Sequence, residues 1–231
     1  MKRIAVLNVV GLTKGLIAKN LPRIRKLAEN LETTSFTPAF PAVTTTAQAT
    51  YLTGTSPSDH GIVGNGWYER EDAEVRFWKQ SNHLIRGEKL WEALRREKSD
   101  FRCAKMFWWY NMYSSADWSV TPRPIYPADG RKVFDVYAHP PGLRDKLVGE
   151  LGEFPFPSFW GPRAGLPSSQ WIADSARWVE EQEQPDLNLV YLPHLDYGLQ
   201  RWGPDASEMG VEFEAIDRLI DELISFCLLY T

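Results

Sequence analysis

The chain has 231 residues, 43% of them hydrophobic, which is enough to bury the core of one large domain. Its 26 lysines and arginines against 30 acidic residues give a net charge of −4, so it lacks the basic surplus that binding to a nucleic-acid backbone requires. Its apolar runs are shorter than the ~20 residues of a membrane helix, so we expect no membrane partner. Residues 1–11 lack the features of a signal peptide, so we expect a cytoplasmic location.

The N-terminal half predicts alternating strands and helices. Residues 4–10 form a near-continuous apolar run ending at Gly11, which is typical of a strand buried on both faces of a parallel sheet. Pro22 suits the first turn of a crossover helix, because apolar residues recur from Ile24 to Leu31 at helical spacing. The next predicted elements are a short strand over 33–40, a helix over 45–53 ended by Gly54, a hairpin over 62–68 and 73–78, and a helix from 90 to 94.

The second half continues the alternation. The predicted elements are a strand over 101–108, long ordered loops over 121–141 and 154–167, helices over 143–151 and 171–179, a fully buried strand over 187–192 and a final helix over 216–227. This order predicts an α/β fold in a single domain spanning residues 1–231. Because another strand ordinarily follows such a helix, we expect the domain to be incomplete at its C-terminus.

Cysteine and tryptophan usage adds two expectations. Cys103 and Cys227 fall in a predicted strand and a predicted helix, so neither a disulfide framework nor a cysteine metal site is expected. Ten tryptophans exceed what a core usually needs, and some should line a site. The aromatic residues of 107–113 could stack on a planar leaving group such as a nucleobase, although strand alternation alone would place half of them in the core.

Three consecutive threonines mark a first candidate site. In α/β sheets ligands bind beyond the carboxyl ends of the strands. Thr44, Thr45 and Thr46 stand at the start of the predicted 45–53 helix, where unpaired N–H groups and the helix dipole favour an anion. The same field would stabilise an alkoxide on a nucleophilic threonine. The alternative is that one of these threonines only caps the helix.

A second candidate site follows the buried strand over 187–192. Residues 191–204 predict a loop in which Asp196 could ligate a cation, with His194 close enough in sequence to assist. The alternative is that Asp196 caps a turn and His194 is an ordinary loop histidine.

A longer pattern connects the threonines to the residues that follow them. It reads Phe40-Pro41-x-x-Thr44, then Thr53-Gly54-x-x-Pro57-x-x-His60-Gly61-Ile62-x-x-Asn65. This pattern resembles the type I phosphodiesterase/nucleotide pyrophosphatase family of the alkaline phosphatase superfamily. Residues 20–28, 90–94 and 107–109 and the segment around Asp196 are also similar to that family. The resemblance implies an alkaline phosphatase-like three-layer domain, with a mostly parallel central sheet and helices on both faces.

The resemblance also implies roles for individual residues. Thr44 would be the nucleophile that forms a phospho-threonine intermediate, and it would also contact metal. Asn65 would donate a hydrogen bond to a non-bridging phosphoryl oxygen. Asp196 would be a metal ligand, and His60 would order its turn rather than take part in catalysis. Family members use two divalent metal ions, so the implied cofactor is a divalent metal, zinc in our prediction.

Departures from the family pattern concern the metal. Val10 stands where the family has an aspartate ligand, and Gln200 stands where its Asp-x-x-Gly-His motif has the histidine. Ala47-Gln48 replaces an Asn-His pair, and the family's remaining ligands would lie past Thr231. We therefore expect one metal ion or none, with Asn8 or His194 as compensating ligands.

The expected function is a metal-dependent hydrolase of phosphodiester or pyrophosphate bonds, acting on a small phosphate ester or nucleotide-like molecule. The 231 residues alone are expected to be inactive. The main alternative is a non-catalytic phosphate- or nucleotide-binding relative that has lost metal ligands. Sulfate-ester or phosphomutase chemistry, and binding of an unrelated aromatic ligand, stay open. The sequence indicates no oligomeric state.

Overall fold

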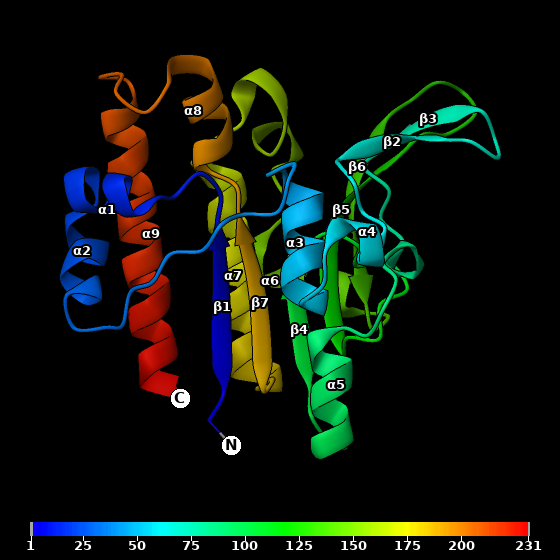
Figure 1. The fold of residues 1–231 in the computed structure, drawn as a ribbon, viewed down its shortest axis with the longest axis horizontal. Coiled ribbons are helices and arrows are strands. Elements are labelled where there is room, and N and C mark those ends of the chain that lie inside the picture. Colours follow the sequence, from blue (N-terminus) through cyan, green and yellow to red (C-terminus); the bar gives the residue numbers. More distant parts are fainter. Residues whose placement is uncertain (1, 231) are drawn as a thin grey trace.

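A five-stranded sheet organises the computed structural model, which describes residues 2–230 and the side chains of residues 2–227. Its strands stand in the order β1 (Ile4–Val9), β7 (Leu187–Leu192), β4 (Cys103–Met106), β5 (Trp118–Ile125) and β6 (Val133–His139). The first four strands are parallel and β6 is antiparallel to β5 (Figure 1). The predicted mostly parallel sheet is therefore confirmed.

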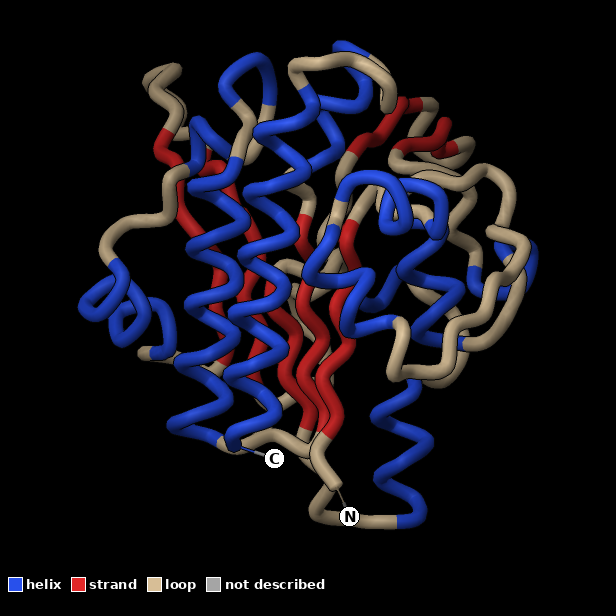
Figure 2. The backbone as a smooth tube through the Cα atoms, turned by 90° about the vertical axis from the view of Figure 1, so that its left-hand side faces the viewer, coloured by secondary structure: helices blue, strands red, loops and turns tan. Residues whose placement is uncertain are grey.

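Helices cover both faces of this sheet. The long helices are α7 (Leu166–Glu183) and α9 (Met209–Tyr230); the others are α1 (Lys14–Asn20), α2 (Pro22–Ala28), α3 (Thr44–Thr53), α4 (Pro57–His60), α5 (Leu90–Glu97), α6 (Leu143–Leu151) and α8 (Leu195–Trp202). Short 3-10 turns cover Asn82–Leu84, Phe156–Ser158 and Gly161–Arg163. Figure 2 shows the sheet edge-on between two layers of helices, with α7 and α9 on one side and α3 and α5 on the other. This arrangement confirms the three-layer α/β fold.

Each face of the sheet has its own hydrophobic core. One core joins α7, α9 and the strand residues that point toward them, such as Met106, Val120 and Val190. The other joins Leu52 of α3 and Trp91 of α5 to the opposite face, including Leu187 and Leu189. Because β7 contributes to both cores, all six of its residues are buried, as predicted for residues 187–192.

Strand β1 differs from the prediction. Residues 4–9 do form a strand, but Ile4 and Val6 are 51% and 36% exposed. In the described part of the chain β1 pairs only with β7 and forms an edge of the sheet, and one of its faces carries no covering layer. The expectation of burial on both faces is therefore wrong.

Three other segments also depart from the predictions. Residues 33–40 form no strand: Pro38 and Pro41 lack N–H donors, and the segment has no strand beside it. Residues 121–141 are not a long loop, because β5 and β6 pair there as a hairpin. Residues 195–202 form helix α8 rather than a loop.

The predicted crossover helix over residues 22–31 ends earlier and packs elsewhere. It is α2, and it lies against α9 rather than directly on the sheet (Figure 1). The Asp217 carboxylate of α9 accepts hydrogen bonds from the backbone N–H groups of Arg23 and Ile24, each at 3.0 Å. This contact satisfies N–H groups that the helix itself leaves unpaired.

Other predictions agree with the structure. The 62–78 hairpin is present as β2 (Gly66–Glu69) and β3 (Glu74–Phe77), and the helices predicted from residues 45, 90, 143, 171 and 216 are all present. Phe107, Trp108, Trp109 and Tyr110 are buried, so most of the aromatic cluster belongs to the cores. Among the described helices, none combines the length and the apolar character that a membrane crossing requires.

Gly54 ends α3 in a left-handed conformation with φ +66°, and a Cβ there would meet no atom within 4 Å. We expect Gly54→Ala to destabilise the protein by about 1 kcal/mol, through backbone conformation alone. Gly149 is the matched control, since it is exposed, lies inside α6 and also has open space around it. Gly149→Ala should stabilise by roughly 0.5–1 kcal/mol. Urea unfolding of both variants measures the change in the free energy of unfolding. Changes of equal size and the same sign in the two variants would contradict the prediction.

Candidate active site

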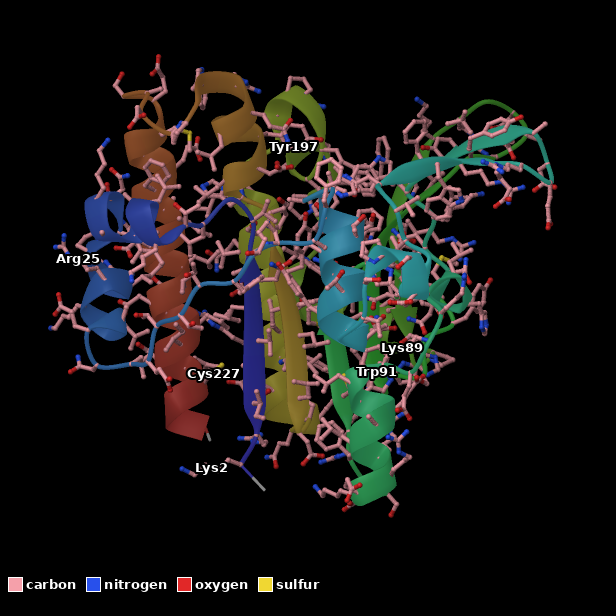
Figure 3. The ribbon with its side chains drawn as sticks, in the orientation of Figure 1. Lys2, Arg25, Lys89, Trp91, Tyr197 and Cys227 are labelled. Atoms are coloured by element: carbon pink, nitrogen blue, oxygen red, sulfur yellow. The ribbon has the colours of Figure 1, made fainter. Side chains whose placement is uncertain are left out.

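A cavity of about 520 Å³ lies beyond the carboxyl ends of β1 and β7, beside the first turn of α3. Thr44, Asn65 and Asp196, the three residues singled out from the sequence, all line it. Val10 and Gln200, the two departures at expected metal positions, line it as well. Tyr197 of α8 also lines it, and Figure 3 shows this residue at the end of the sheet where α8 begins. The predicted site residues thus lie together beyond the carboxyl ends of the strands, where α/β sheets typically bind ligands.

Thr44 is the first residue of α3. The residue before it, Val43, occupies the capping position and makes no side-chain capping bond among the described residues. The Thr45 hydroxyl is used differently, since it donates to the Gly64 carbonyl at 2.7 Å. The alternative that one of these threonines caps the helix is therefore wrong, and the half-buried Thr44 side chain faces the cavity.

The orientation of the Asn65 side chain is fixed by two donors. The backbone N–H of Thr45 lies 3.1 Å from Asn65 Oδ1, and the Thr45 hydroxyl lies 3.0 Å from the same atom. A backbone N–H can only donate, so the atom facing it must be the oxygen of the carboxamide. The Nδ2 group of Asn65, which lines the cavity, is then left with its two donors for a bound group.

The same reasoning orients Asn8 at the end of β1. The backbone N–H of Trp109 donates to Gln48 Oε1 at 2.8 Å, so Gln48 presents Nε2 on its other side. That Nε2 donates to Asn8 Oδ1 at 2.9 Å. Asn8 Nδ2 accordingly has no acceptor among the residues that the structure describes, and Asn8 lines the cavity.

Asp196 lies in the first turn of α8, and its Oδ1 accepts a hydrogen bond from Gln200 Nε2 at 2.9 Å. Of the cavity-lining residues in the described chain, Asp196 is the one with a charged side chain. His194 does not turn toward it. Its Nε2 lies 2.8 Å from a Glu212 oxygen of α9, and burial lowers the pKa of the ring although Glu212 opposes that shift.

The residues of this chain do not by themselves fit a metal ion. Residues 2–227 hold no group of three or more His, Cys, Asp or Glu side chains placed to bind one. Val10 offers no donor atom, and His194 is engaged with Glu212. Asn8, the other expected compensation, has its oxygen held by Gln48. Compensation by His194 is therefore not what the structure shows, whereas compensation by Asn8 stays a prediction, because an amide oxygen has a second lone pair.

Aromatic rings form one wall of the cavity. Trp78 and Trp109 have ring centroids 4.9 Å apart, and Trp109 and Trp160 lie 6.4 Å apart and nearly parallel, at 11°. The Trp109 indole N–H meets no acceptor at full hydrogen-bond geometry within the described residues, although it interacts with the Tyr191 hydroxyl. Burial raises the pKa of the Tyr191 hydroxyl, and side-chain contacts with Thr44 and Trp109 oppose that shift. Tyr51, Phe159, Tyr191 and Tyr197 complete the aromatic lining.

His60 lies away from this cavity. It is fully buried, its Nδ1 accepts from the Ile62 N–H at 3.1 Å, and its Nε2 lies 3.0 Å from the Thr50 hydroxyl. Burial lowers the pKa of this ring, which therefore favours the neutral form. These contacts connect α3 to the turn after α4 and match the ordering role expected for His60.

The sequence does not single out two cavity residues, Trp78 and Trp160, or Gln48, which lies behind the cavity and bonds to Asn8. Trp78 follows β3 and Trp160 lies between two 3-10 turns, so no shared motif connects them. The available signal was the tryptophan count, which predicts that some rings line a site without saying which.

The family model for type I phosphodiesterase/nucleotide pyrophosphatase matches residues 4–227. The chain belongs to the type I phosphodiesterase/nucleotide pyrophosphatase family. An uncharacterised pyrophosphatase/phosphodiesterase of Schizosaccharomyces pombe is 27% identical over 210 residues, which cover 88% of this chain and 36% of that protein. The family resemblance predicted from residues 40–65 is confirmed.

Solved structures support the fold of this phosphodiesterase-family chain. Murine ectonucleotide pyrophosphatase/phosphodiesterase 5 superposes with a TM-score of 0.65 at 13% identity, covering 99% of this chain and 53% of its own. Phosphonoacetate hydrolase from Sinorhizobium meliloti gives 0.64 at 15% identity, covering 97% and 54%. The chain thus spans about a third of its curated relative and about half of these structures.

Proposed function

We propose that the protein containing this chain hydrolyses a phosphodiester or pyrophosphate bond, with Thr44 as the nucleophile. The observation that carries the proposal is the pairing of Thr44, on the first turn of α3, with the free donor group of Asn65 in one cavity. A nucleophile beside a fixed donor is the arrangement that phosphoryl transfer needs. Family membership supports this chemistry.

The proposed reaction has two steps. The Thr44 oxygen attacks phosphorus, the Oγ–P bond forms, the bond from phosphorus to the leaving-group oxygen breaks, and the hydroxyl proton passes through solvent to the leaving-group oxygen. Water then attacks phosphorus and the Oγ–P bond breaks. One proton of that water passes to the Thr44 oxygen, which restores the hydroxyl and releases the phosphoryl product. During both steps Asn65 Nδ2 donates to a non-bridging oxygen, whose negative charge the first turn of α3 also stabilises.

A small anionic substrate agrees with the relatives. The murine neighbour has been solved as an inactive threonine-to-alanine variant in complex with AMP, and the bacterial hydrolase in complex with phosphonoformate or phosphonoacetate. We propose a substrate of similar chemistry, a small molecule with a phosphoryl group and an organic leaving group. The aromatic wall of Trp78, Trp109 and Trp160 could pack against a planar leaving group.

Trapping the covalent intermediate tests this proposal. The full-length protein that contains this chain is mixed with bis(4-nitrophenyl) phosphate, quenched in acid during turnover and digested for mass spectrometry. We expect a phosphoryl adduct on Thr44, and no adduct in the Thr44→Ala variant. Turnover with an adduct on another residue, or with none, would overturn the assignment of Thr44.

A second candidate function is non-catalytic binding of a phosphate or nucleotide. The observation in its favour is that Val10 and Gln200 occupy two positions of the family's metal ligands. In that case phosphate esters bind in the cavity but are not turned over by the full chain. The adduct experiment separates the two functions, because only the hydrolase forms the Thr44 adduct.

Two finer expectations belong to this proposal. A divalent cation, zinc in our proposal, would require ligands in addition to Asp196, the one carboxylate that this chain places at the cavity. Loss of zinc binding in Asp196→Ala, measured by elemental analysis, would support that role. A cytoplasmic location is likewise part of the proposal, which fractionation of cells checks.

A further inference from the structure

The cavity offers neutral donors at the place where a metal-dependent site would offer carboxylates. Val10 carries no ligand atom, and Asn8, two residues before it on β1, presents an amide. The Gln48 bond holds the oxygen of that amide away from the cavity. Asn8 therefore offers its two Nδ2 donors, rather than its oxygen, to a group bound in the cavity.

Asn65 repeats this arrangement from another segment of the chain. Its oxygen is held by the backbone N–H and the hydroxyl of Thr45, and its Nδ2 is left for the cavity. The two asparagines come from β1 and from the loop after α4, so their agreement does not follow from local sequence. Both side chains are half-buried, which limits competition from water.

A third donor is available in the same wall. Trp109 is only 2% exposed and lines the cavity, and its indole N–H interacts with the Tyr191 hydroxyl but meets no described acceptor at full hydrogen-bond geometry. A buried donor without a partner costs free energy unless a ligand or water accepts from it. The backbone N–H of Trp109 also donates to Gln48, and Gln48 in turn donates to Asn8, so this N–H fixes the orientation of both side chains.

We propose that Asn8 and Asn65, with the Trp109 indole, form a donor site that binds a tetrahedral oxyanion without a metal ion. The ligand class is a phosphoryl or phosphonyl group. This inference rests on the proposed function only in assuming that a phosphoryl group binds in this cavity. It assigns Asn8 a role in binding that group and Gln48 a role in positioning Asn8. Asp196 also lines the cavity, and its carboxylate accepts a hydrogen bond from Gln200.

Titration of the full chain with inorganic phosphate tests the proposal, by calorimetry and by tryptophan fluorescence. The protein is first freed of metal with EDTA, and the titration is repeated with added zinc. We expect phosphate binding in the metal-free protein, whether or not added zinc then strengthens it. Binding that appears only with zinc would overturn the proposal while leaving the assignment of Thr44 untouched.

Variants of Asn8 make the test specific. Asn8→Ala should weaken metal-free phosphate binding by about tenfold, as for loss of a hydrogen bond to a charged group. Asn8→Asp has nearly the same shape but replaces two donors with a negative charge, so metal-free binding should be lost and should return with zinc. Asn30→Ala is the control, since the Asn30 side chain is exposed and bonds only to Lys26 of its own segment. The proposal would be overturned if the metal-free Asn8→Asp variant bound phosphate with the wild-type affinity.

The role of Gln48 is tested by a double variant. Gln48 does not line the cavity, so Gln48→Met should weaken phosphate binding only by releasing Asn8. The combined variant with Asn8→Ala should then bind no more weakly than Asn8→Ala alone. Thermal unfolding of each variant confirms that it is folded. Fully additive losses would overturn the positioning role.

Discussion

Thr44→Ala should abolish turnover of bis(4-nitrophenyl) phosphate by the full-length protein that contains this chain, with kcat falling by roughly 10⁴-fold or more. The physical reason is that alanine has no oxygen to attack phosphorus, while the cavity and Asn65 remain in place. Thr44→Ser keeps a hydroxyl on the first turn of α3 and should retain part of the activity. Steady-state kinetics of the three proteins, each at saturating substrate, is the measurement.

Thr53→Ala is the matched control for this experiment. Thr53 is the last residue of the same helix, and its hydroxyl bonds to the Ala49 carbonyl and to Thr55, away from the cavity. We expect its kcat to be unchanged. If Thr44→Ala instead turned over the diester at the wild-type rate, Thr44 would not be the nucleophile.

The stability of the protein should rise between pH 7 and pH 9, because of Lys105. This β4 residue is fully buried, its Nζ donates to the Tyr110 carbonyl at 3.3 Å and lies 4.8 Å from the centre of the Trp91 ring. Within residues 2–227 no carboxylate forms a salt bridge with it. Figure 3 shows Lys89 and Trp91 at the start of α5. Burial lowers the pKa of Lys105 to about 7.

The direction of the effect follows from proton binding. The unfolded chain binds the lysine proton below about pH 10.5, whereas the folded chain binds it only below about pH 7. Between these values the unfolded state holds more protons, so the free energy of unfolding increases with pH by up to about 1.4 kcal/mol per unit. Cys103 acts in the opposite direction above about pH 9, because burial raises the pKa of its thiol to about 12. The rise is therefore confined to pH 7–9.

Lys105→Met should remove this slope, and it should make the protein more stable at pH 7 because the buried amine is gone. Lys146→Met is the control, since Lys146 is exposed and also lies over an indole ring, that of Trp178, at 5.9 Å. Urea unfolding at several pH values between 7 and 9 gives the slope for each protein. A slope that persists in Lys105→Met would contradict the assignment.

The threonine site could be predicted because its signals lie close together in sequence. Thr44 and Asn65 belong to one ordered pattern of residues 40–65, and the structure places both at the same cavity. The bond between Gln48 and Asn8 could not be predicted in this way. It joins side chains that are 40 positions apart, and it exists only because the end of β1 lies beside α3.

The errors in the fold have particular causes. Pro122 and Pro124 suggested a loop, but they lie past Val120, the last β5 residue paired with β4, where the strand has a single neighbour and tolerates missing donors. Gly198 lies in α8, in the segment predicted to be a loop. A Cβ there would approach Met209 to 3.0 Å, so this glycine lets α8 lie close to α9. Both effects depend on neighbours that local patterns do not reveal.

The position of β1 has a consequence for how the protein folds in a cell. This strand is synthesised before β7, and residue 4 pairs with residue 187. At about 5–20 residues per second, a ribosome needs roughly ten seconds or more to deliver that partner. Throughout this time an apolar strand remains unpaired, and contacts of such long sequence separation also form slowly. Its nascent chain is therefore a natural client for chaperones that hold apolar segments until β7 emerges.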